Sequence, residues 1–250
     1  QRQMCIRDSF KKLKVYSKVK RTPGMKVITT RWIDTNKGDS QNPELRSRLV
    51  VRELALSKRN DFFAATPPLE SLRFILSLCA SNQHHGRGKD FIVMSNDVKR
   101  AYFYAPAKRL MYVEIPAEDR ENGDEGMVGM LNLCLYGTRD AAMNWADTYT
   151  KHLKERGFVA GRASPCNFYH PGRNIAVTVH GDDFTSTGAE GDLRWLDAEL
   201  KGLYEIKSKY LGPSPDKGHL QELRILMDEP RFDIRSRPKA CGANSPRTTT

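Results

Sequence analysis

Two adjacent carboxylates, Asp182 and Asp183, are the residues of this sequence that most clearly suggest a chemical role. They follow residues 175–179, where Ile and Val alternate with Ala and Thr as in a half-buried strand. Gly181 precedes them, so we expect a hairpin whose tip carries both carboxylates. Two ionised carboxylates this close repel each other unless cations neutralise them. The segment is therefore a solvated turn or a divalent-metal site, and the turn is the better interpretation of so short a motif alone.

A third carboxylate, Asp97, extends the metal hypothesis. It ends the apolar run 91–98, which has the composition of a buried strand. An acid at the end of a core strand is costly unless it has a partner or a metal. If the two strands are neighbours in one sheet, three carboxylates meet and could bind two Mg²⁺ ions for an in-line phosphoryl transfer.

The elements that would position these acids follow from hydrophobic periodicity and turn residues. Thr66-Pro67-Pro68 opens a helix whose apolar residues recur at helical spacing. We also expect helices over 138–156 and 189–204. Strands are expected over 26–33, 46–52, 91–98, 110–115, 131–136, 166–169, 174–179, 205–211 and 219–227. This order predicts an α+β fold in which an antiparallel sheet is covered by helices on one face.

The positive charge of the chain is concentrated near its start. Residues 1–60 hold 16 Lys and Arg against 5 Asp and Glu, so the entire formal excess of +11 lies there. A surplus confined to one segment suggests a surface for a polyanion, with nucleic acid as the first candidate. The alternative is a basic solvated tail. Arg46 and Arg48 lie two residues apart on an expected strand, so they share a face that suits a phosphate chain or simply deters edge aggregation.

Other features bound the class of protein. The five cysteines are widely spaced and form no CxxC pair, which favours a reducing compartment over a disulfide framework or a zinc site. No apolar run approaches the ~20 residues of a membrane span. Residues 1–9 resemble translated adaptor sequence, so we expect a non-native leader there. Residues 230–250 are rich in Arg, Pro, Ser and Thr, which predicts a disordered or truncated tail.

Eight motifs, taken in order, carry a resemblance to a known family. They are Arg46-Ser47-Arg48-Leu49-Val50-Val51-Arg52, Phe63-Ala64 with Leu72-Arg73, Asp97-Val98-Lys99-Arg100-Ala101-Tyr102, Met111-Tyr112-Val113 with Ile115-Pro116, Leu135-Tyr136-Gly137 with Trp145, Leu153 with Gly157-Phe158, Gly181-Asp182-Asp183, and Tyr210-Leu211-Gly212. Their order and spacing resemble the reverse transcriptase domain of Ty1/copia-type retrotransposon polyproteins, over about residues 26–227. Their joint occurrence is far more specific than any one of them.

The resemblance implies a role for each matching residue. Asp97, Asp182 and Asp183 would be the catalytic and metal-binding acids. Arg46 and Arg48 would hold the triphosphate, and Tyr102 would lie under the incoming sugar and exclude a 2′-hydroxyl. The nucleotide pocket would be lined by Tyr136 and Gly137, with Lys207 near the proton donor to the leaving pyrophosphate.

The resemblance also implies an architecture, cofactors and partners. The fold would be a right-hand polymerase, with a basic fingers-like segment over 10–90 and a palm-like catalytic segment, including part of the fingers, over 91–229. The cofactor would be two Mg²⁺ ions, with Mn²⁺ as a substitute. Partners would be dNTPs, a primed RNA or DNA template, and RNase H and integrase domains elsewhere in the polyprotein, without a membrane. The location would be cytoplasmic, in a virus-like particle, or nuclear.

The chain departs from the family pattern at His180 and Gly181, before the aspartates, and at Asp140, where the family favours an amide. Three alternatives stay open. A catalytically dead remnant would only bind nucleic acid through its basic segment. A viral RNA-dependent RNA polymerase shares Gly-Asp-Asp, but the bulk of Tyr102 opposes a ribose hydroxyl. A metal-dependent nuclease would share the acids and would need neither Tyr102 nor the paired arginines.

Overall fold

The computed structural model describes residues 10–36, 38–53, 62–84 and 91–212. By its internal contacts the chain divides into two units, Gln1–Tyr210 and Leu211–Thr250, and only Leu211 and Gly212 of the second are described. The leader at 1–9, the strand at 219–227 and the tail at 230–250 lie outside the described residues, so these expectations stay predictions. None of the described helices is long and apolar enough to cross a membrane.

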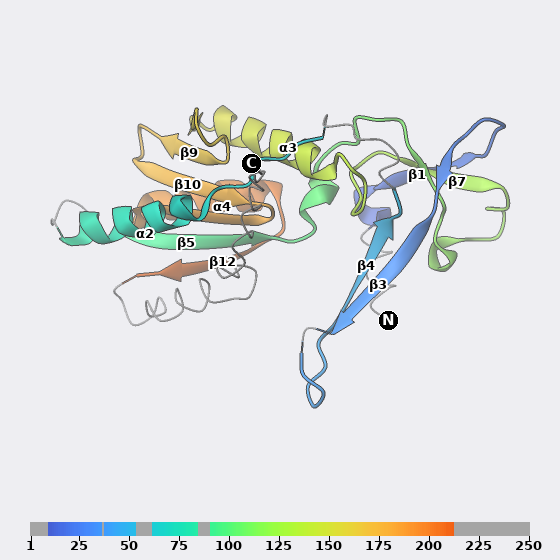
Figure 1. The fold of residues 1–250 in the computed structure, drawn as a ribbon, viewed down its shortest axis with the longest axis horizontal. Helices are drawn as coiled ribbons and strands as arrows, with labels where there is room; N and C mark the ends of the chain where they lie inside the picture. Colours follow the sequence, from blue (N-terminus) through green and yellow to red (C-terminus); the bar gives the residue numbers. More distant parts are fainter. Residues whose placement is uncertain (1–9, 37, 54–61, 85–90, 213–250) are drawn as a thin grey trace, which may run out of the picture. The chain divides into compact units, whose positions relative to one another are not determined.

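A six-stranded sheet carries the acidic residues. Its strands follow the order β12-β5-β11-β10-β9-β8 (Figure 1). The strands are β5 (Phe91–Val98), β8 (Val159–Ala160), β9 (Asn167–His170), β10 (Ile175–His180), β11 (Asp183–Ala189) and β12 (Ile206–Leu211). The pairs β5–β11, β11–β10, β10–β9 and β9–β8 are antiparallel. The predicted α+β class and antiparallel sheet are therefore confirmed.

Helices cover this sheet on both faces, so the prediction of helices on one face was wrong. Helices α3 (Ala141–Glu155) and α4 (Glu190–Leu203) share a core with Ile92 and Met94 of β5. Helix α2 (Leu69–His84) packs on the other face, where its Cys79 contacts Thr187, the cross-strand partner of Val93. Neighbouring strand residues point to opposite faces. Every residue from Phe91 to Met94 is buried, which a strand covered on one face does not need.

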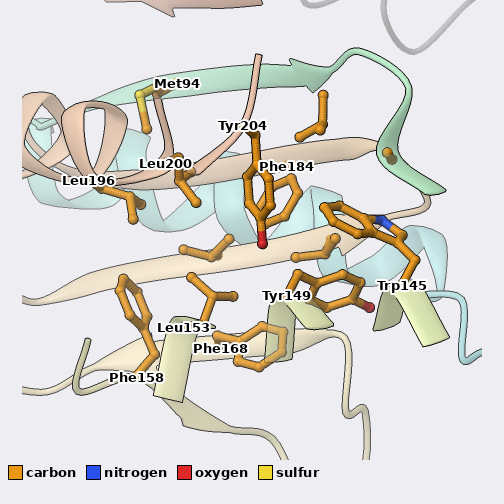
Figure 2. Close-up of a cluster of buried hydrophobic side chains, with 14 of the residues drawn as sticks. Met94, Trp145, Tyr149, Leu153, Phe158, Phe168, Phe184, Leu196, Leu200 and Tyr204 are labelled. Carbon is orange, nitrogen blue, oxygen red and sulfur yellow. The ribbon is translucent and has the colours of Figure 1, made fainter. Parts of the chain in front are cut away.

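The core between the sheet and α3 and α4 is rich in aromatic rings. Trp145, Tyr149, Phe184 and Tyr204 meet edge to face (Figure 2). Its buried members are Ile92, Met94, Val98, Ala101, Ala105, Cys134, Ala141, Trp145, Tyr149, Leu153, Phe158, Phe168, Ile175, Val177, Val179, Phe184, Leu193, Leu196, Leu200 and Tyr204. The helix expected over 138–156 carries a stripe at helical spacing, formed by Ala142, Trp145, Tyr149 and Leu153. The last three lie in this core, and Ala142 is only half-buried.

The N-terminal strands lie in two smaller sheets, one of which also contains two strands from residues 112–131. A four-stranded sheet has the order β1-β7-β6-β2. Its strands are β1 (Tyr16–Lys20), β2 (Val27–Ile28), β6 (Tyr112–Val113) and β7 (Met127–Leu131), so the strand expected over 131–136 was misplaced. Residues 132–134 instead form single hydrogen bonds to Val15 and Ala105. Strands β3 (Thr30–Asn36) and β4 (Leu45–Val51) pair as a separate antiparallel ribbon (Figure 1). Two short 3-10 helices are η1 (Ala101–Tyr104) and η2 (Ala117–Asp119), and residues 10–13 are also helical.

Candidate active site

The hairpin that carries the acidic pair turns as the sequence predicts. His180 of β10 faces Asp183 of β11, which leaves Gly181 and Asp182 as a two-residue loop. Gly181 has φ of 64°, and an added Cβ would meet nothing within 4 Å. A positive φ at the first loop residue is typical of a type II′ turn, which favours glycine there for backbone rather than steric reasons. Gly181, a departure from the family pattern, therefore fits the local backbone.

Asp97 lies directly across from Asp183. The two residues are register partners in the β5–β11 ladder, and the Val98 amide donates to the Asp182 carbonyl at 2.9 Å. Side chains of cross-strand partners point to the same face, with Cβ atoms about 5 Å apart. Like charges in this position are destabilising unless something offsets them. The adjacency expected for the two acidic strands is thus present, and Asp97 faces the second acid of the pair.

The hairpin tip is held from beneath by Trp145 of α3. Its indole Nε1 donates to the Gly181 carbonyl at 2.8 Å, and the side chain is 1% exposed. Figure 2 shows Trp145 beside Tyr149 and Phe184, the residue that follows Asp183. Sequence reasoning placed Trp145 in a helical stripe and missed this contact, because spacing along one helix does not reveal a polar partner on another element.

Two tyrosines lie near Asp182. The Tyr102 ring in η1 is 4.8 Å from that of Tyr136, centroid to centroid. Burial raises the pKa of Tyr102 above its ordinary value, and the negative charge of Asp182 adds to this. Burial raises the pKa of Tyr136 to about 12, again with a contribution from Asp182. The two predicted pocket residues and the first acid of the pair therefore form one electrostatic neighbourhood.

The predicted phosphate-binding arginines reach the same neighbourhood. Arg46 and Arg48 alternate on β4 and pair with Thr35 and Ile33 of β3, so they share a face of the ribbon. The Arg48 guanidinium carbon lies 6.0 Å from the centre of the Tyr136 ring. The positive charges of Arg48 and Arg46 lower the pKa of Tyr136, against the larger effects of burial and Asp182. Paired cations thus lie near Tyr136, at a distance over which charges interact.

Gly137 joins the base of the ribbon to the pocket. The Val51 amide donates to the Tyr136 carbonyl at 2.7 Å. Gly137 has φ of 87°, and a Cβ at this position would lie 2.2 Å from the Val51 carbonyl oxygen. Both the backbone conformation and the close approach require glycine. The sequence predicted Gly137 as a pocket residue, and the contact with Val51 gives it a structural role as well.

Lys207 lies on β12 beside the strand that ends in Asp97. The Lys99 amide donates to the Glu205 carbonyl at 2.9 Å, and the Asn96 side chain donates to the Ser208 hydroxyl at 3.1 Å. These bonds join β12 to the residues on either side of Asp97, and Lys207 lies between their partners Glu205 and Ser208. The Lys207 side chain is exposed. Lys207 therefore lies on the strand next to β5, with its side chain open to solvent.

Asp140 is matched by a cation that sequence reasoning missed. Its carboxylate is 2.7 Å from Arg109, which also holds Glu53 through two bonds of 2.9 and 3.0 Å. Burial pushes the pKa of Asp140 upward, but the Arg109 hydrogen bond and charge bring it below its ordinary value. Asp140 therefore has a cationic partner, which it shares with Glu53. Arg109 lies in an irregular segment, where no periodicity could have announced its partners.

The donor set suits Mg²⁺ or Mn²⁺, because carboxylate oxygens are the ligands that these ions prefer. Asp97 and Asp183 project from one face, and Asp182 follows at the adjoining turn. In the part of the chain that the structure describes, no three His, Cys, Asp or Glu side chains are gathered as a metal-binding group. The residues thus fit the ions in type and in backbone position, and the side chains would have to converge to bind them.

Comparison with known proteins identifies the family of this chain. The family model described as "Reverse transcriptase (RNA-dependent DNA polymerase)" matches residues 13–215. The chain is also 27% identical over 216 residues to the retrovirus-related Pol polyprotein from transposon TNT 1-94 of Nicotiana tabacum. That alignment covers 83% of this chain and 16% of the polyprotein, so the chain spans about a sixth of its relative. The resemblance predicted from the sequence is confirmed, and the chain belongs to the reverse transcriptase (RNA-dependent DNA polymerase) family.

Proposed function

We propose that this domain is an RNA-directed DNA polymerase that extends a primer with deoxynucleotides on an RNA or DNA template. The observation that carries the proposal is the register of β5 and β11, which pairs Asp97 with Asp183 and bonds Val98 to the Asp182 carbonyl. Family membership supplies the reaction class. The fingers-like segment at 10–90 and the palm-like segment at 91–229 remain part of this proposal.

The three acids would act together as a ligand set. Two divalent cations held by Asp97, Asp182 and Asp183 would supply Lewis acidity to the primer 3′ oxygen and offset the charge of the transferred phosphoryl group. Trp145 supports this role because its bond to Gly181 limits how far the hairpin tip can move. A fixed tip keeps the carboxylates from relaxing apart under their mutual repulsion.

The remaining residues would bind and select the nucleotide. Arg46 and Arg48 would neutralise the β and γ phosphates, a role that suits their fork geometry and shared face. Tyr102, whose ring packs against that of Tyr136, would exclude the 2′-hydroxyl of a ribonucleotide by bulk. Gly137 would let the pocket backbone approach β4. Lys207 would hold a proton at Nζ for the departing pyrophosphate.

A second function has one observation in its favour. Because no three acidic or other ligand side chains are gathered within the described ranges, a remnant that only binds nucleic acid is the competing proposal. Its basic first segment would bind template through phosphate contacts, with a strong dependence on salt. In either case we propose a polyprotein context with RNase H and integrase domains, in cytoplasmic virus-like particles or the nucleus.

Primer extension separates the two proposals. With Mg²⁺, the unmodified protein should extend oligo(dT) on poly(rA), and Asp182→Asn should reduce the rate by at least about 10²-fold, as loss of a group that stabilises the transition state does. Asp147→Asn, which alters an exposed acid paired with Lys108, serves as the control. Unmodified protein that binds primed template without extending it would support the remnant instead. Extension by Asp182→Asn at the full rate would show that this acid is not a ligand.

A further inference from the structure

The turn that leads from Asp97 to Tyr102 has an unusual backbone. Arg100 precedes η1 with φ of 57° and ψ of 42°, in the left-handed region. Only a few per cent of residues other than glycine adopt this region, because the Cβ crowds the backbone. A strained residue persists where surrounding contacts enforce it. The position of Tyr102, two residues further on, therefore depends on what holds Arg100.

Glu205 supplies those contacts from the other side of the turn. Its carboxylate binds the Lys99 ammonium at 2.7 Å and also pairs with the Arg100 guanidinium. Its carbonyl accepts the Lys99 amide at 2.9 Å. Its own amide donates to the Tyr104 hydroxyl at 2.9 Å. Glu205 thus grips the residues on both sides of Tyr102.

The 3-10 helix between these two grips is short and internally bonded. The Phe103 amide donates to the Arg100 carbonyl at 2.9 Å, and the Ala105 amide donates to the Tyr102 carbonyl at 3.1 Å. A change in the backbone of Arg100 is therefore passed directly to Tyr102. The Tyr104 ring also packs against Tyr204, the neighbour of Glu205, at 5.1 Å between centroids. Both ends of η1 are therefore fixed to the segment 204–205.

Resting on the proposed function, we propose that Glu205 is a positioning residue that sets the selectivity for deoxyribonucleotides over ribonucleotides. It acts through Tyr102: its carboxylate holds Lys99 and Arg100 at the start of η1, while its backbone amide holds the Tyr104 hydroxyl at the far end. Without the carboxylate, Arg100 can relax, η1 can shift, and the Tyr102 ring withdraws from the sugar. Deoxynucleotide binding itself needs no contact with Glu205.

Glu205 is ionised at neutral pH, as its ion pairs with Lys99 and Arg100 require. The hydrogen bond from Lys99 and the charge of Arg100 hold the pKa of Glu205 below its ordinary value, against a smaller opposite effect of burial. The Glu205 side chain is 46% exposed, so each ion pair alone contributes little to the stability of the fold. The substitution should therefore move selectivity much more than melting temperature, which distinguishes positioning from a general structural role.

The first test measures selectivity without turnover. Affinities for dATP and ATP are compared in complexes on a dideoxy-terminated primer with templating uridines. Glu205→Ala should reduce the preference for dATP by about tenfold, a coupling in the range that contacting residues show. Tyr102→Ala should lose the preference, and adding Glu205→Ala to it should change nothing further. Glu199→Ala is the control and should leave the preference unchanged. It removes a glutamate of α4 that pairs with Arg156.

The second test does not require polymerase function. Amide hydrogen exchange of the protein alone should show faster exchange at Lys99, Phe103 and Ala105 in Glu205→Ala, by about tenfold, and not in Glu199→Ala. Unchanged exchange at all three amides, or an unaltered preference for dATP in Glu205→Ala, overturns the proposal. Additive losses in the double variant also overturn it, because Glu205 would then act independently of Tyr102. If neither nucleotide binds the unmodified complex, the proposed function fails and the exchange data still decide the role of Glu205.

Discussion

The acids and the arginines of the candidate site lie on two differently supported regions of the molecule. Asp97 lies near the end of β5 and Asp183 begins β11, in a six-stranded sheet with packed helices on both faces. Phe91–Met94 and Ile175–Val179 of this sheet are buried throughout. Arg46 and Arg48 lie on the two-stranded ribbon of β3 and β4, where Leu49 and Val51 are the buried residues. An isolated two-stranded ribbon is marginally stable at best.

This difference assigns separate tasks to the two regions. Groups that share cations need fixed spacing, which a close-packed interior provides. Groups that bind a mobile triphosphate tolerate a support that is fixed at one end only. The ribbon is fixed at its base. There Val51 bonds to Tyr136, and Glu53 bonds to Arg109. The comparison predicts that stability is concentrated in the sheet and that the ribbon contributes mainly through its base.

The largest expected effect comes from removing the support of the hairpin tip. Trp145→Ala should lower the free energy of unfolding by about 3 to 5 kcal/mol, because it empties a fully buried site and frees the Gly181 carbonyl. Trp32→Ala is the matched change on the ribbon, where the indole is only partly buried and donates to Glu118. Denaturant unfolding measures both. Equal losses in the two variants would break the comparison.

A smaller effect is expected at the base of the ribbon. Gly137→Ala should cost roughly 2 kcal/mol, from the left-handed backbone and the clash with the Val51 carbonyl. Gly123→Ala is the control, because Gly123 also has a positive φ but an added Cβ would meet nothing within 4 Å. Thermal unfolding should therefore separate the clash from the backbone strain. Matching losses would mean that the approach to Val51 is easily relieved.

Low pH should destabilise the contacts at the base of the ribbon. Burial is the largest single effect on the pKa of Glu53 and of Asp140 and raises both. The hydrogen bonds and charge of Arg109, with further hydrogen bonds, together bring both pKa values below their ordinary values. Lowered carboxyl pKa values stabilise the fold above the unfolded-state values near 4 and lose this effect as pH falls through the folded-state values. Unfolding free energy should therefore drop below about pH 4. In Arg109→Met this loss should shrink or reverse, because burial would then raise both pKa values and protonation would no longer favour the unfolded chain. Identical profiles would remove Arg109 as the cause.

The smallest effect on stability is expected from the ribbon arginines. Arg48→Gln should change the free energy of unfolding by less than about 0.5 kcal/mol, as for most surface substitutions. It should instead raise the KM for dNTPs, since the triphosphate would lose a charged partner. Arg31→Gln, an exposed arginine of β3, provides the control. A loss of stability without a change in KM would assign Arg48 to the ribbon fold and not to the substrate.

Local sequence patterns predicted most elements of the sheet and its helices. The run 91–98, the hairpin to Val179 and the stripe of Trp145, Tyr149 and Leu153 are each visible in periodicity, because burial on one face imposes it. Residues 131–136 also alternate, but they do not form the expected strand. The pairing of β7 with β1 runs from Met127 to Leu131 and ends there, and its pairing with β6 covers only Gly129 and Met130. The second covered face of the sheet was missed because an amphipathic helix such as α2 does not specify which face it covers.

The candidate site divides in the same way. Asp97, Asp182 and Asp183 could be found because acids at the ends of apolar runs are unusual, and family motifs extended the set to Tyr102 and Gly137. The partners of these residues could not be found. Arg109 meets Asp140, and Glu205 meets Arg100, through contacts between segments far apart in sequence, where charged residues leave no periodic signal.

The pairing of β5 with β11 also has a consequence for synthesis. These strands are neighbours in the sheet, but α3 and the β8–β10 segment separate them along the chain. Such long-range pairing forms slowly, because the loop must close before the contact gains anything. While the ribosome is still translating that segment, β5 is an apolar strand without its neighbour, and such edges aggregate. Asp97 and Asp183 can therefore come together only after residues 183–189 have emerged from the ribosome. A shorter nascent chain would lack this pairing and would tend to aggregate.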